Sequence, residues 1–300
     1  MKKTDTRFCD PTCDFAFKRI FGSELYKDAT IGFINSILTD RVIRDVKFMN
    51  VEIPGLTEDD RKSCVDVLCT GDDGSTFIIE MQVVEHEFFR QRTVLYASTL
   101  ISHLAEKGHE WDYHLNPTYV ISVIDFILDE HGPESCIHHY TTREIQTGAV
   151  LYGAPEFFFL EPCRFKKKRH ELSNYQEKWL FLFRDTKSLE VIPDEFLGDK
   201  AFNAYFEASE TSKMTQEERI LYDRAMITKT DIKYGKEFSF KQGKAEGKAE
   251  GIAEGEARGK AETRLEVARK MLAAGVDISI VVDCTGLSRD ELAGFEPQSH

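Results

Sequence analysis

The chain has 300 residues, of which 41% are hydrophobic and 11% aromatic, and its formal net charge is −13. This much apolar material can build a large core, which excludes a globally disordered chain and allows one large domain with an appendage, or two domains. The negative charge argues against a broad nucleic-acid-binding surface but leaves room for a local one.

Targeting and redox signals are weak. No apolar run reaches the ~20 residues that a membrane-spanning helix needs, and residues 1–5 lack the apolar stretch of a signal peptide. The seven cysteines are scattered without zinc-site spacing, which is typical of free thiols in a reducing compartment. We therefore expect a cytoplasmic protein with no membrane partner.

The spacing of apolar residues predicts helices and strands through most of the chain. Asp10 and Pro11 are expected to begin the first helix, as its cap and its first residue. In chain order, the expected elements are a helix at 14–22, a helix at 27–38, a strand at 46–53, a β-hairpin at 63–83, a helix at 88–107, strands at 119–124, 138–142 and 156–160, and helices across 172–226. This order predicts an α/β domain with a mixed sheet, over residues 1–235.

The tail differs in kind from the rest of the chain. Glycine recurs at every fourth residue from Gly243 to Gly259, and alanine recurs with the same period. Residues 236–264 are therefore either a flexible linker or a helix with a stripe of small residues, and we favour the helix. Because each glycine costs about 1 kcal/mol inside a helix, close approach of a second copy would help to stabilise it. This makes homo-oligomer formation through the C-terminal helix a hypothesis.

Residues 265–300 are expected to hold short helices around the turn Thr285-Gly286-Leu287. The last helix is opened by a capping box at 288–291. Two helices around a glycine turn allow a helix-turn-helix. We favour a plain helical hairpin, because Asp290, Glu291 and Glu296 leave the last helix without a basic reading face.

The hairpin at 63–83 carries the most informative residues. Its two strands flank a Gly-Asp-Asp-Gly turn, and each strand carries one acid, Asp66 or Glu80. Alternation along a strand predicts that Asp66 shares a face with Cys64 and Leu68. The same rule places Glu80 beside Gln82. Two acids on buried strands are costly without a cationic partner, and Mg²⁺ is the simplest one because it prefers oxygen ligands.

Phosphodiester hydrolysis is a reaction that such a site can perform. It needs an activated water and neutralised charge on the phosphoryl group, and bound Mg²⁺ supplies both. Asp66 and Glu80 offer fixed carboxylates, and the carbonyl of Met81 is a further candidate ligand. The amide of Gln82 can orient a water or a phosphate oxygen, although it provides no cation.

These residues resemble a known family. Asp66 followed by Glu80-x-Gln82 across a hairpin resembles the PD-(D/E)XK nuclease superfamily, most members of which have Lys as the third residue. The Glu-x-Gln form is similar to its transposase-like branch, the Rpn recombination-promoting nucleases. The segment Asp14-Phe15-Ala16-Phe17-Lys18 is similar to that branch's N-terminal helix motif, and Arg92 with Tyr96 matches its helix signature. The segment at 161–165, Glu-Pro-Cys-Arg-Phe, departs from the Glu-Leu-Pro-Lys-Phe usual in the family.

The resemblance implies a restriction-endonuclease-like mixed β-sheet flanked by helices, with an α-helical C-terminal tail. It also implies a Mg²⁺-dependent DNA endonuclease associated with recombination or transposition. In this chain Asp66 and Glu80, together with the Met81 carbonyl, would bind the metal, and Gln82 would complete the catalytic site. The implied DNA-binding residues are Lys18, Arg92 and Tyr96, and the implied additional acid is Asp14.

Other interpretations remain open. Glu80 can be a solvent-facing strand residue, Asp14 a helix-start acid favoured by the dipole, and Arg92 and Tyr96 a packed pair on one helix. The acidic net charge and the missing motif lysine favour a catalytically inactive DNA-binding or protein-interaction module that retains the nuclease fold. A third hypothesis makes the tail an oligomerisation arm of an otherwise inert domain.

Overall fold

The computed structural model describes residues 6–53, 63–105, 114–129, 132, 134–151 and 153–292. The chain divides into two compact units, Met1–Lys233 and Tyr234–His300. The predicted separation of 236–264 from 265–300 as distinct domains stays a prediction.

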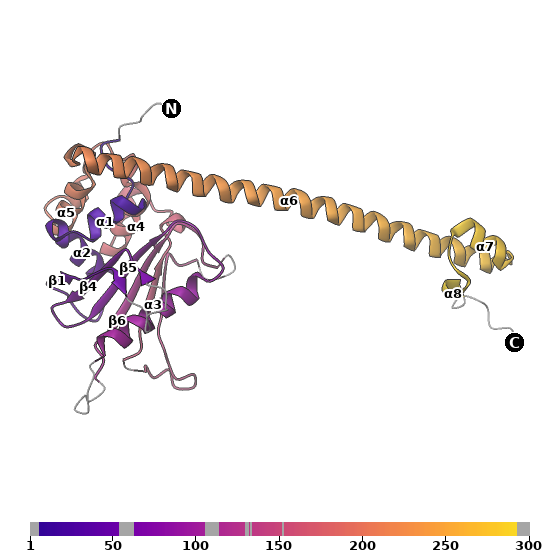
Figure 1. The fold of residues 1–300 in the computed structure, drawn as a ribbon, viewed down its shortest axis with the longest axis horizontal. Coiled ribbons are helices and arrows are strands. Elements are labelled where there is room, and N and C mark those ends of the chain that lie inside the picture. Colours follow the sequence, from indigo (N-terminus) through magenta and orange to yellow (C-terminus); the bar gives the residue numbers. More distant parts are fainter. Residues whose placement is uncertain are drawn as a thin grey trace. The chain divides into compact units, whose positions relative to one another are not determined.

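A mixed sheet forms the centre of the first unit, and six strands belong to it within the described residues (Figure 1). The strand order is β1-β4-β5-β6-β8-β7, in which β5, β6 and β8 run parallel and the other neighbours antiparallel. The strands are β1 (Val46–Phe48), β4 (Val67–Gly71), β5 (Thr76–Gln82), β6 (Thr118–Ile124), β7 (Ile137–Tyr140) and β8 (Glu156–Leu160). The carboxyl ends of the three parallel strands therefore meet at one edge of the sheet.

Helices cover both faces of this sheet (Figure 1). One face packs against four helices, which are α1 (Asp14–Phe21), α2 (Lys27–Ile37), α4 (Tyr175–Asp185) and α5 (Lys200–Ser209). Their core is aromatic, with the ring centroid of Phe33 5.2 Å from that of Phe21 and 5.5 Å from that of Trp179. The other face packs against α3 (Phe89–Leu104) through Ala97 and Leu100. This confirms the predicted restriction-endonuclease-like α/β fold.

The long strands that the sequence predicted are broken in the structure. Residues 46–53 form β1 and β2 (Glu52–Ile53), and β2 pairs with the separate short strand β3 (Ser63–Cys64). The chain bends at Asp66 before β4 begins, so strict alternation from Cys64 to Leu68 is wrong. Val65 and Leu68 consequently pack on the same face, the one toward α3.

The start of the first helix also differs from the prediction. Helix α1 begins at Asp14, not at Pro11. Asp10 instead accepts hydrogen bonds from the backbone and side chain of Thr12 and forms an ion pair with Lys229 at 2.9 Å. Burial works against ionisation of Asp10, but these partners lower its pKa below the ordinary value. Asp10 therefore binds Lys229 of helix α6 (Gln216–Ala273) and does not cap α1.

The tail is helical, which confirms the α-helical tail and excludes the flexible linker. The glycine and alanine repeat lies in α6 (Gln216–Ala273), which is followed by α7 (Ile278–Thr285) and α8 (Arg289–Leu292). Gly286 ends α7 with a left-handed φ of 68°, which favours glycine. Ser288 and Glu291 form the predicted capping box, whereas Glu296 lies outside the described residues. The apolar side chains around Ala268, Val281 and Leu292 form a small core in this unit.

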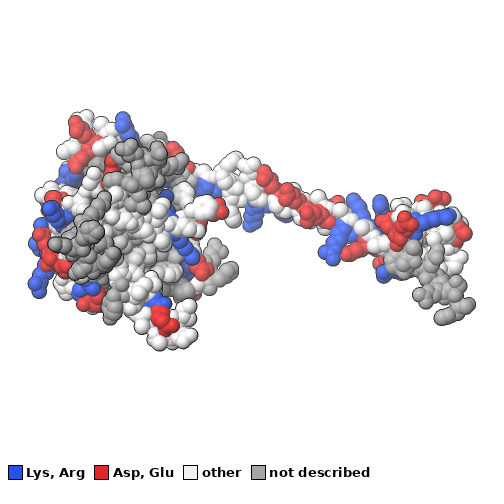
Figure 2. Space-filling view, turned by 60° about the horizontal axis from the view of Figure 1, so that its bottom comes forward, with Lys and Arg blue, Asp and Glu red and all other residues white. Residues whose placement is uncertain are grey.

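Charged side chains of both signs are interspersed over the face of the folded unit that Figure 2 shows. Within the part of the chain that the structure describes, no helix combines the length and the apolar character that a bilayer crossing requires.

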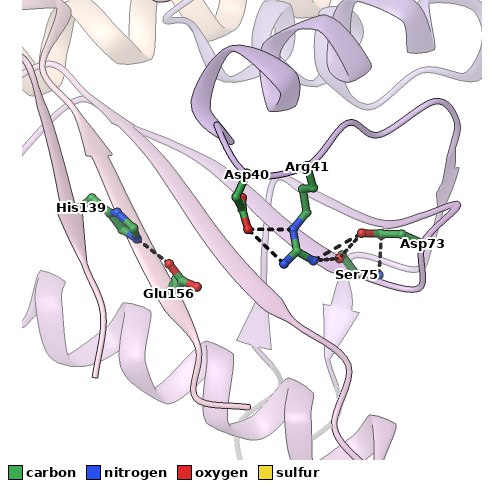
Figure 3. A network of polar contacts seen from close by, with 6 residues as sticks. All are labelled: Asp40, Arg41, Asp73, Ser75, His139 and Glu156. Atoms are coloured by element: carbon green, nitrogen blue, oxygen red, sulfur yellow. Dashed lines mark hydrogen bonds and ion pairs between the residues drawn. The ribbon is translucent and has the colours of Figure 1, made fainter. Parts of the chain in front are cut away.

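A polar network lies at the amino end of β5 (Figure 3). Arg41 donates to Asp73 at 3.4 Å and to Ser75 at 3.3 Å, beside the turn that joins β4 to β5. On the neighbouring strands β7 and β8, His139 and Glu156 lie 2.5 Å apart. Ser75 precedes β5. This network therefore lies at the opposite end of β5 from Glu80, the acid that the sequence predicts to act in catalysis.

Candidate functional site

The two predicted metal-binding acids lie on neighbouring strands near the carboxyl end of β5. The antiparallel register pairs Val67 of β4 with Ile79 of β5, so one step outward position 66 lies opposite position 80. The bend before β4 turns the Asp66 side chain toward β5, where its Oδ2 accepts a hydrogen bond from the Met81 N–H at 2.9 Å. The fold therefore brings together the acids that the sequence predicted to share a site.

Glu80 is an acid buried without full compensation. Glu80 is only 2% exposed, and its Oε2 has no hydrogen-bond partner among the described residues. Burial, reinforced by the negative charge of Asp66, raises the pKa of Glu80 to about 7, against opposing effects of Arg92 and Lys18. The solvent-facing interpretation of Glu80 is therefore wrong. An orphaned carboxylate oxygen of this kind is costly unless a cation or a proton compensates it.

Asp66 is partly buried and held by two donors. Burial raises its pKa, and the Met81 N–H and the Lys18 ammonium oppose that rise. Lys18 Nζ lies 3.3 Å from Asp66 Oδ1 and 2.7 Å from Asp14 Oδ1. Since Asp14 and Lys18 are one turn apart on α1, this helix delivers an ammonium group and a further acid to the rim of the site.

Helix α3 brings the remaining predicted residues to the same place. Arg92 Nη2 donates to Gln82 Oε1 at 2.7 Å, and the guanidinium carbon of Arg92 lies 5.9 Å from the centre of the Tyr96 ring. Burial raises the pKa of Tyr96, and the charges of Glu80 and Asp66 act in the same direction. Arg92 and Tyr96 therefore pack together, as one interpretation held, and the charge of Arg92 also lowers the pKa of Glu80.

Ser122 is a polar residue of this region that sequence reasoning missed. The parallel register of β5 and β6 pairs it with Glu80. Ser122 is fully buried, and its Oγ has no hydrogen-bond partner within the described part of the chain. The signal was available, because a serine interrupts the otherwise apolar segment 119–124.

Glu161 begins the segment at 161–165 that departs from the family pattern, and the structure shows how this buried acid is paired. It is fully buried at the end of β8, accepts from the backbone N–H of Leu128 at 2.8 Å and from Arg164 Nε at 2.6 Å, and lies 3.3 Å from His138 Nε2. Its charge is therefore compensated within the fold, in contrast to that of Glu80.

The donor set fits a divalent metal that prefers oxygen. In the described ranges no group of three or more His, Cys, Asp or Glu residues is arranged to hold a metal ion. The carboxylates that would hold one here are those of Asp66 and Glu80. The N–H of Met81 faces Asp66, and the carbonyl of a strand residue points to the same edge as its N–H. The Met81 carbonyl therefore points to the edge of β5 on which Asp66 lies. Few protein ligands and several waters suit Mg²⁺.

Comparison with known proteins identifies two parts of the chain. A family model described as PD-(D/E)XK nuclease family transposase matches residues 11–238. A second model, described as the C-terminal HTH domain of the Rpn/YhgA-like nuclease family, matches residues 261–295. This second match favours the helix-turn-helix over the plain helical hairpin that the acidic residues of the last helix had favoured. No curated protein and no solved structure matches the chain.

Proposed function

Because the chain belongs to the PD-(D/E)XK nuclease family transposases, we propose that it is a Mg²⁺-dependent DNA endonuclease acting in recombination or transposition. Family membership supports a nuclease role in recombination. The observation that carries the finer proposal is the pair formed by Asp66 and by Glu80, whose buried Oε2 lacks a partner among the described residues. This pair has the chemistry and the placement of a site that needs a cation.

Each residue of the site has a proposed role. Asp66, Glu80 and the carbonyl of Met81 would hold the metal ion. Bound Mg²⁺ supplies an activated water and neutralises charge on the phosphoryl group. The amide of Gln82 would orient the water or a phosphate oxygen, and its Oε1 is already fixed by Arg92, which leaves its NH₂ group to donate.

Two cations compensate for the absence of the motif lysine. Lys18 works against the rise in the pKa of Asp66 that burial causes, and it is still 42% exposed, so its ammonium can also contact a DNA phosphate. The guanidinium of Arg92 lies beside Gln82 and lowers the pKa of Glu80. Lys18, Arg92 and Tyr96 are therefore proposed to line the path of the DNA backbone past the acids, with Asp14 as an additional acid at the rim.

A plasmid-nicking assay tests this proposal. We expect cleavage of duplex DNA that requires Mg²⁺ and is lost in the variants Asp66→Asn and Glu80→Gln. The matched control Glu207→Gln, which alters an exposed acid paired with Lys213, should cleave like the parent. Persistent cleavage in both site variants would refute the assignment of the site.

The alternative function is a catalytically inactive DNA-binding or protein-interaction module. It is favoured by Gln82, because no lysine stands at the third motif position. This alternative expects binding of DNA or of a protein that needs no metal and survives loss of both carboxylates. If no divalent metal supports cleavage while DNA binding stays intact, the inactive module is the correct function.

The tail supports two further proposals about partners. A helix-turn-helix at 261–295 would contribute a second DNA contact. The helix α6 would bring two copies together along its small-residue stripe. Truncation at about residue 240 should remove self-association, and an unchanged oligomeric state would contradict the second proposal.

A cytoplasmic location stays a prediction.

A further inference from the structure

A small cationic pocket, separate from the site described above, lies at the carboxyl edge of the parallel strands. Its cavity of about 190 Å³ is lined by Arg184, Lys187, Lys229 and Lys233, together with the acids Asp10 and Asp125. All of these residues belong to the first unit. In a chain whose net charge is −13, four cations around one cavity are a local concentration of positive charge.

The acids around this pocket leave one lysine charge uncompensated, because Arg184 pairs with Asp185 at 2.6 Å and the three lysines share Asp10 and Asp125. Asp10 is shared by two ammonium groups, with Lys229 Nζ at 2.9 Å and Lys187 Nζ at 3.9 Å from the same Oδ2 atom. Lys233 pairs with Asp125 at 2.5 Å. The side chains of Lys187 and Lys233 remain 46% and 48% exposed. An anion that enters the cavity can therefore reach both of these ammonium groups.

The sheet connects the pocket to β5, the strand that carries Glu80 and Gln82. Ile124, which ends β6, and Asp125, which follows it, both line the pocket, and the register pairs Ile124 with Gln82 of β5. The N–H of Asp125 donates to the Gln82 carbonyl at 2.9 Å. The backbones are about 5 Å apart, but the Gln82 side chain lies on the α3 side of the sheet, whereas Phe183 and Arg184 of α4 line the pocket from the other side. Both the pocket and the proposed active site lie at the carboxyl edge of the parallel strands, where ligands of open α/β sheets bind.

From this placement and charge, we propose that the pocket of Arg184, Lys187, Lys229 and Lys233 binds a backbone phosphate of the DNA at the carboxyl edge of the sheet. The inference rests on the proposed function, and it assigns to these lysines a positioning role. Lys229 and Arg184 are more buried than the other two and are held by Asp10 and Asp185. Lys187 and Lys233 supply the exposed charge that releases counterions when the DNA docks.

The test measures DNA binding by the full chain in the absence of metal, so that cleavage does not enter. Fluorescence anisotropy with a labelled duplex, at salt concentrations from about 50 to about 200 mM, gives the slope of log K against log salt. For Lys187→Gln combined with Lys233→Gln we expect about tenfold weaker binding and a slope smaller by about 1 to 2. The charge-keeping pair Lys187→Arg and Lys233→Arg should bind like the parent.

The matched control combines Lys200→Gln with Lys213→Gln, two exposed lysines that pair with acids elsewhere on the unit. If the control loses as much affinity and slope as the pocket variant, the effect is one of general charge and the proposal fails. Parent-like binding by the pocket variant also overturns it. If the double variant does not fold, Lys187→Gln alone decides, because its nearest acid oxygen is 3.9 Å away.

Two further measurements separate the sources of the anion and the two proposals. If inorganic phosphate raises the melting temperature of the parent but the pocket variant binds DNA normally, the pocket takes a free anion and the DNA assignment is wrong. If the parent never cleaves DNA but the pocket variant shows the reduced slope, the pocket stands and the endonuclease proposal fails. If the parent cleaves DNA and the pocket variant keeps the parent slope, the endonuclease proposal stands and the phosphate pocket fails.

Discussion

Replacement of Glu80 by glutamine should stabilise the metal-free protein at alkaline pH. Burial raises the pKa of Glu80 from 4.5 to about 7, so between these values the folded state binds a proton that the unfolded state has lost. The stability of the parent therefore falls as the pH rises through this window, and the loss is complete above the folded pKa. At 1.36 kcal/mol per pKa unit, the shift corresponds to about 3 kcal/mol.

Urea unfolding in EDTA, at about pH 4.5 and about pH 8.5, measures this effect. Tryptophan fluorescence is a suitable signal because Trp179 is fully buried in the same unit as Glu80. The free-energy difference between Glu80→Gln and the parent should grow by about 3 kcal/mol between the two pH values. Comparison across pH removes any pH-independent cost of burying the new amide.

The control and the metal complete this test. Glu254→Gln, at an exposed position of α6, should show the same pH dependence as the parent. Mg²⁺ should restore the stability of the parent at alkaline pH, since it compensates the ionised carboxylate, and should have little effect on Glu80→Gln. Equal pH dependence in parent and Glu80→Gln would refute the electrostatic reasoning, and equal stabilisation of both by Mg²⁺ would refute the metal site.

Three other substitutions test the packing and the site. Gly32→Ala should destabilise by about 1 to 3 kcal/mol, because the new Cβ would lie 2.2 Å from the Cβ of Ala201; an unchanged urea midpoint would contradict this packing. Gly235→Ala, where a Cβ meets nothing within 4 Å, should instead raise helicity and stability by up to about 1 kcal/mol, and a loss of circular-dichroism signal would oppose the prediction. Lys18→Gln should cost less than about 1 kcal/mol of stability, because Lys18 is partly exposed. It should nevertheless slow plasmid nicking about tenfold or more by removing a charge beside Asp66; parent-like nicking would exclude that role.

Much of the fold follows from local patterns in the sequence. The apolar spacing that predicts α1 and α2 places the same side chains in the core, whereas α3 buries Ala97 and Leu100 but leaves Leu95 and Leu104 exposed. The segment 119–124 is apolar on both faces because β6 is covered on both sides. The repeat of glycine and alanine specifies a helix with little side-chain bulk on one stripe. These features depend on periodicity, which any sequence displays directly.

The breaks in the strands could not be predicted in this way. The bend at Asp66 interrupts an apolar run that has the pattern of one strand, because Val65 is buried against the α3 face and Val67 against the other. Likewise, Asp10 followed by proline has the signature of a helix start. Its charge is used instead to hold Lys229, which is more than 200 residues away in the sequence.

The sequence by itself determined which residues are proposed to carry the chemistry: Asp66, Glu80 and Gln82, with Lys18 and Arg92 on predicted helices. Only the tertiary structure decided how those charges act on one another. Burial of Glu80, its pairing with Ser122, and the ammonium of Lys18 between two acids arise from strand register and helix packing. Electrostatic effects depend on distance and solvent exposure, and neither quantity is written in the order of residues.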